Sequence, residues 1–127
     1  MNSRALLVAT TRICVAVAGL SSAAAVILAV RYHPTPRSVM IALLAVTFLS
    51  VPLVGAGIAR SEPRNPVGWI VLASGCFLPL AAAAYLYARA AFQEHADLPA
   101  APWAGWLDGW PWVPAVAVIP VVGLLLF

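Results

Sequence analysis

Charged side chains are scarce in this sequence, and lysine does not occur. The basic residues are seven arginines, the acidic ones number four, and together they make up 9% of the 127 residues. Soluble domains carry roughly 25% charged residues. The arginines stand apart between apolar runs, whereas nucleic-acid binding needs a basic face with many phosphate contacts. We therefore expect an integral membrane protein of the plasma membrane and no nucleic-acid partner.

Side chains suited to catalysis or metal binding are equally few. The two histidines lie in different loops, and His95, with Glu94 and Asp97 beside it, lacks the second histidine or cysteine that a metal site needs. Cys14 and Cys76 lie inside apolar runs, where cysteine packs as a small apolar residue. No glycine-rich phosphate loop or nucleophile–base pair is recognisable. We predict no catalytic, metal or cofactor residues, and hence no enzyme within these residues.

Apolar runs are what the chain has in abundance, since 64% of its residues are hydrophobic. Four runs approach the roughly 20 residues that a helix needs to cross about 30 Å of hydrocarbon. Backbone amides in lipid must pair within their own segment, so runs of this length predict helices. We expect an all-α, single membrane domain over 1–127, a four-helix bundle with helices at about 5–31, 38–59, 66–89 and 111–127.

The arginines near the ends of these runs bear on orientation. Four fall on one side of the membrane, at positions 4, 12, 60 and 64, and three on the other, at 31, 37 and 89. Cytoplasmic loops carry the excess of arginine, so the count favours both termini in the cytoplasm. Arg12 also interrupts the apolar start of the chain, which argues against a cleaved signal peptide.

The turn between the second and third runs reads RSEPRNPVGW, residues 60–69. Asn65 is a good N-cap and Pro66 suits the first helical position, where no N–H is needed. Trp69 lies one turn further, at the depth of lipid headgroups. We predict a cytoplasmic turn built by Arg60, Arg64, Asn65, Pro66 and Trp69, and we favour it over a reactive loop.

Four of the five tryptophans gather just before the fourth run. If the stretch PWAGWLDGWPW, residues 102–112, is helical, Trp103, Trp106 and Trp110 stand at i, i+3 and i+7, while Asp108 points away from that stripe. We expect a short Trp-rich helix lying in the outer interface. Its tryptophans either form an aromatic belt or line a pocket that contacts a lipid or small-molecule ligand.

Small residues and prolines interrupt the apolar runs. The small residues let helices approach closely, and they are Gly19, Ser22, Ala23, Gly55, Gly57, Ser74, Gly75 and the run 81–84. Prolines inside a helix remove a backbone hydrogen bond and should kink it, and they stand at positions 52, 79, 114 and 120.

Part of the sequence resembles a known family. The resemblance rests on two stretches, GAGIARSEPRNPVGWIVLASG at 55–75 and WLDGWPWVPAVAVIPVVGLLLF at 106–127. Over the last two thirds of the chain the order of parts resembles the N-terminal membrane region of actinobacterial sensor histidine kinases. That family continues into a dimerising helix pair with the phospho-accepting histidine and an ATP-binding domain. These 127 residues lack both parts, and neither His33 nor His95 matches the phospho-acceptor.

The resemblance therefore implies a non-catalytic anchor and sensor module of a two-component system, embedded in the lipid bilayer and homodimeric if it is kinase-like. A small accessory membrane protein that packs against a larger complex is an alternative. A four-helix transporter is a further one, although the apolar runs carry no Asp, Glu, Lys or His for ion coupling.

Overall fold

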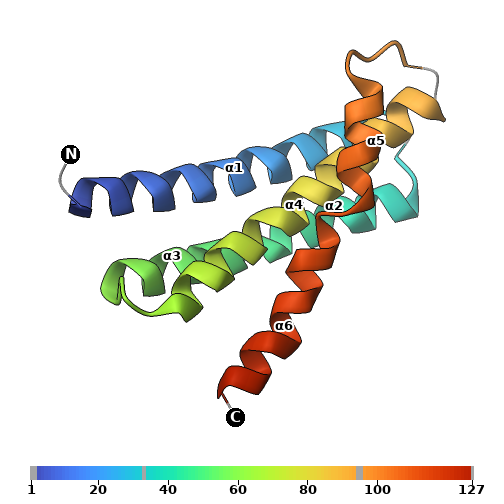
Figure 1. Cartoon of the computed structure of the whole chain (residues 1–127). Coiled ribbons are helices and arrows are strands. Elements are labelled where there is room, and N and C mark those ends of the chain that lie inside the picture. Colours follow the sequence, from blue (N-terminus) through green and yellow to red (C-terminus); the bar gives the residue numbers. More distant parts are fainter. Residues whose placement is uncertain (1–2, 33, 94–95, 127) are drawn as a thin grey trace.

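The computed structural model describes residues 3–32, 34–93 and 96–126. Every regular element in these ranges is an α-helix, which confirms the all-α fold class (Figure 1). In chain order the helices are α1 (Ser3–Arg31), α2 (Pro36–Phe48), α3 (Ser50–Ser61), α4 (Pro66–Phe92), α5 (Ala101–Gly109) and α6 (Trp112–Leu126).

Three helical stretches are long and apolar enough to cross a membrane. They are Ser3–Arg31, Pro36–Ser61 and Pro66–Phe92, with 29, 26 and 27 residues. At 1.5 Å per residue even the shortest measures about 39 Å, more than the roughly 30 Å of hydrocarbon. Helix α6 has 15 residues, or about 22 Å at the same rise, and falls short. Three of the four predicted spans are therefore supported, and the fourth stays a prediction.

The second span is interrupted at Leu49, between α2 and α3. Pro52 causes this, because it has no N–H to donate to the carbonyl of Phe48 four residues earlier. Leu49 keeps helical dihedral angles, φ −60° and ψ −24°, so the chain continues in nearly the same direction. The predicted proline effect is therefore met only in part: the helix is interrupted before Pro52 with no sharp bend, and α4 runs through Pro79 without ending.

Helix α4 is the centre of the fold and contacts each of the other five helices described. Figure 1 shows α1 and the α2–α3 stretch running alongside it, α5 crossing one end, and α6 diverging from the bundle. Large aliphatic side chains point outward: Leu20 is 71% exposed, Leu43 62% and Leu53 52%. An apolar outer surface of this extent suits lipid rather than water.

Glycines allow α3 and α4 to approach until their backbones touch. A Cβ on Gly55 would lie 2.7 Å from Leu72 Cα, and one on Gly75 would lie 2.6 Å from Pro52 N. Real Cβ atoms do not come so close, so only glycine fits at these two crossings. Gly19 and Gly57 have nothing within 4 Å of such a Cβ. The prediction of close packing is thus right for the first pair and wrong for the second, whose helix faces are turned outward.

Polar side chains join α1 to each of its neighbours. Ser22 Oγ lies 3.0 Å from the carbonyl oxygen of Ala45 on α2, and Cys76 Sγ of α4 lies 3.3 Å from that of Cys14. Both cysteines are free thiols inside the packed helices. Hydrogen bonds between membrane helices contribute about 0.6 kcal/mol on average. Their effect here is to fix the rotation of α1 against the bundle.

The bundle has two distinct ends. At the N-terminal end, where α1 begins and the α3–α4 turn lies, Arg60 Nε donates to Thr11 Oγ1 at 2.9 Å. At the opposite end, which we call the α5 end, the α1–α2 turn meets the last turns of α4. There Arg89 Nη1 lies 3.4 Å from Thr35 Oγ1. Polar side chains thus gather at both ends, as expected for a bundle whose ends meet membrane surfaces.

Candidate functional site

The α3–α4 turn at the N-terminal end is closed by its own side chains. Asn65 is the N-cap of α4, with Oδ1 accepting from the Val67 N–H at 3.0 Å, and Pro66 opens the helix. Trp69 Nε1 donates to the carbonyl of Pro63 at 3.0 Å and so ties the first turn of α4 back to the loop. The predicted cap is confirmed, and these contacts hold the turn in its conformation.

The two arginines of this turn have different surroundings. Arg60 reaches across to α1, where Thr11 is fully buried, and it borders a cavity of about 310 Å³ together with Arg4. Arg64 is exposed on the surface of the protein. Arg60 therefore helps to hold α1 against α3, while Arg64 is free to meet lipid headgroups.

The three tryptophans singled out in the sequence form one aromatic row along α5. The ring centroids of Trp103 and Trp106 are 6.4 Å apart and those of Trp106 and Trp110 are 5.3 Å apart, both edge-to-face. Trp103 is 69% exposed, Trp106 57% and Trp110 40%. Trp110 is the C-cap of α5 and lies 6.2 Å from the ring of Phe77 on α4. The row thus faces outward, anchored to the bundle at its inner end.

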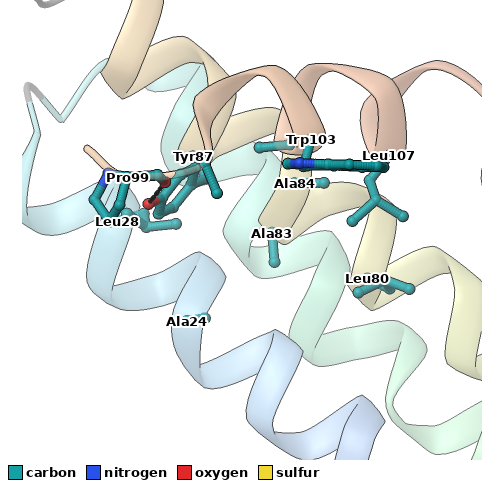
Figure 2. Close-up of a pocket in the computed structure, with 11 residues that line it drawn as sticks. Ala24, Leu28, Leu80, Ala83, Ala84, Tyr87, Pro99, Trp103 and Leu107 are labelled. Carbon is teal, nitrogen blue, oxygen red and sulfur yellow. Dashed lines mark hydrogen bonds between the residues drawn. The ribbon is translucent and has the colours of Figure 1, made fainter. Parts of the chain in front are cut away.

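A cavity of about 300 Å³ opens beneath α5, between α1 and α4. Its walls are almost entirely apolar, with Leu28 from α1, Leu80 from α4 and Leu107 from α5 (Figure 2). Tyr87 Oη donates to the carbonyl of Pro99 at 2.6 Å and so holds the segment before α5 over the opening. Trp103 lines this cavity, whereas Trp106 and Trp110 are not among its lining residues.

Polar side chains gather on the other side of α4, still at the α5 end. Arg37 of α2 lies over the ring of Tyr85, 5.8 Å from its centroid. Tyr85, Arg89 and Asp108 border a common cavity of about 220 Å³. Burial raises the pKa of the Asp108 carboxyl above its usual value. Asp108 thus faces α4, away from the tryptophan row.

Sequence reasoning missed this polar cluster, which also includes Thr35. One signal was present, because Tyr85 and Arg89 stand four residues apart and so share a face of α4. A second was the Thr-Pro-Arg-Ser sequence at 35–38, which forms a capping box: Thr35 accepts from the Ser38 N–H, and Ser38 accepts from the Thr35 N–H. The capping box starts α2 at Pro36, two residues before the predicted start.

Metal-binding chemistry is not visible in the described ranges, where no three His, Cys, Asp or Glu side chains cluster. Glu94 and His95, for which no metal site was predicted, lie outside those ranges. What the arrangement offers is binding: an apolar cavity beneath α5 and a polar cluster beside it. No protein-family model, curated protein or solved structure matches this chain.

Proposed function

We propose that the protein is a non-catalytic, membrane-embedded anchor and sensor module, comparable to the input region of a sensor histidine kinase. The observation that carries the proposal is the apolar cavity beneath α5, bounded by two membrane-length helices, α1 and α4. The aromatic row above it supports a position at headgroup depth, where an apolar or amphiphilic molecule would enter from the bilayer.

The connection from α5 to α6 gives such a molecule a way to act. Only Trp110 and Pro111 separate the two helices, and Pro111 is fully buried. A molecule wedged between α4 and α5 would move Trp103 outward and carry the start of α6 with it. Since α6 packs on α4, a change at α5 would alter how α6 leaves the bundle.

Orientation completes the proposal. The arginine bias favours an orientation with the N-terminal end in the cytoplasm and α5 outside. Helix α6 would then be directed back toward the cytoplasm. A sensor of this kind would act as a homodimer if it is kinase-like. Ion-coupled transport is disfavoured, because all four acidic residues lie outside the three candidate spans. Glu62 directly follows Ser61, the last residue of the second span.

A quenching experiment tests the cavity. In a protein whose sole tryptophan is Trp103, with phenylalanine at the other four positions, bromooctane should quench fluorescence saturably, because the heavy atom binds against the indole. Ala24→Leu, which fills the wall contributed by α1, should abolish the saturable component.

The matched control keeps only Trp69, at the opposite end of the bundle, and should show a linear response from partitioning alone. Equal saturable quenching of Trp69 and Trp103, or no effect of Ala24→Leu, would contradict the proposal.

A further inference from the structure

Two cavities on the α2 side of α4 share a wall. The polar one of about 220 Å³ is bordered by Arg89, Gln93, Asp108 and Tyr85. The second, of about 240 Å³, is bordered by Tyr85 and Asp108 as well and continues between α2 and α4. The two cavities adjoin at Tyr85 and Asp108, and we treat them together as one groove, with a polar head at the α5 end and an apolar remainder.

The polar head contains a guanidinium with too few partners. Arg89 makes one long hydrogen bond, 3.4 Å to Thr35 Oγ1, and its Nε is buried without a hydrogen-bond partner in the part of the chain described. A buried unsatisfied donor is costly and calls for an explanation. Arg37 stands close by, over Tyr85. Within the polar head, the Arg89 guanidinium and the Asp108 carboxyl border the same cavity. This pair favours an anion that also carries a hydrogen-bond donor.

The apolar remainder of the groove has the length of one membrane leaflet. Along α4 it descends from Arg89 to Leu78, and along α2 it reaches Phe48. Eleven positions separate Arg89 from Leu78, which is about 16 Å at 1.5 Å per residue. Half of a hydrocarbon core of about 30 Å is nearly the same depth. An acyl chain in the groove would thus end near the middle of the bilayer.

We propose that this groove binds one anionic glycerophospholipid from the leaflet at the α5 end. The phosphate pairs with Arg89, a headgroup hydroxyl donates to Asp108, and one acyl chain lies between α2 and α4. Arginine suits this role because its planar fork bonds two phosphate oxygens at once. The assignment rests on the membrane placement in the proposed function and is independent of the sensing role.

Native mass spectrometry of the purified full chain in detergent tests the assignment. Phosphatidylglycerol should be retained about tenfold more tightly than phosphatidylcholine with the same acyl chains, as expected for a charge-assisted pair. Arg89→Gln should reduce retention to the phosphatidylcholine level, and Arg89→Lys should keep part of the preference. Ala81→Phe, which fills the apolar part, should lower the retention of both lipids.

Arg31→Gln is the matched control, since Arg31 is exposed at the same end and borders neither cavity. This variant should leave the retention of both lipids unchanged. A thermal melt of each variant verifies folding. If Arg89→Gln does not fold, the lipid retention of Arg89→Lys and Ala81→Phe tests the proposal. Equal retention of the two lipids, or full retention by Ala81→Phe, would overturn the proposal. If soluble glycerol phosphate displaced phosphatidylglycerol with the same affinity as the lipid itself, the acyl chain would contribute nothing. The proposal of a lipid site would then be overturned in favour of a site for phosphate alone. None of these results would affect bromooctane quenching of Trp103.

Discussion

Gly55→Ala is expected to lower the free energy of unfolding by about 1–3 kcal/mol, the usual cost of overpacking a tight contact. The added Cβ would lie 2.7 Å from Leu72 Cα. The obstacle is backbone and cannot rotate away as a side chain can, so α3 and α4 must separate. The measurement is a denaturation curve of the purified protein in detergent, followed by circular dichroism.

Gly57→Ala provides the matched control in the same helix, two residues further on. Nothing lies within 4 Å of its Cβ position, and alanine is the better helix former by roughly 1 kcal/mol. This variant should be as stable as the parent or more so. If both variants behaved alike, the α3–α4 crossing described here would be wrong.

Leu72→Ala should cost about 2 kcal/mol or more, through loss of packing and an unfilled cavity. Leu72 is 1% exposed and lies where α3 crosses α4. In lipid the gain from burying apolar surface is small, so van der Waals contacts supply most of the stability of such a crossing. Removing them cannot be offset by lipid, which has no access to this position.

Leu53→Ala is the comparison for this second variant, because Leu53 is 52% exposed on the outer face of α3. Lipid can replace its contacts, and the change in unfolding free energy should stay within about 0.5 kcal/mol, as for surface positions in general. A loss at Leu53 equal to that at Leu72 would mean that the outer face of α3 is itself a packed interface.

The helices were predictable because their signals are local. Apolar length defined the spans, Asn65 and Pro66 marked the start of α4, and Pro52 marked the interruption of the second span. Such features depend on neighbouring residues alone. The helical spacing of the tryptophans likewise predicted α5, which spans Ala101–Gly109.

Helix pairing could not be predicted from the same sequence. Gly55 and Gly57 look equivalent in a list of small residues, yet one touches the backbone of α4 and the other faces open space. The difference depends on how α3 is rotated against α4. That rotation is fixed by many weak contacts between segments distant in the chain, for which a single sequence carries no direct signal.

The polar part of the groove was missed for the same reason. Thr35, Arg89 and Asp108 come from three separate segments and meet only when α2, α4 and α5 are packed together. Read singly, each looked like a residue at a membrane surface. Of the three tryptophans that made the α5 segment conspicuous by composition, only Trp103 lines the cavity beneath α5.

The central claim is a module that crosses the membrane with the α3–α4 turn in the cytoplasm and α5 outside, and cysteine accessibility in intact cells tests it most directly. Single cysteines are placed at Ser61 and Gln93, both exposed, in a background with serine at positions 14 and 76. An impermeant maleimide should label Gln93→Cys in intact cells and Ser61→Cys only after permeabilisation. Labelling of Ser61→Cys in intact cells, with Gln93→Cys protected, would invert the topology and contradict the account.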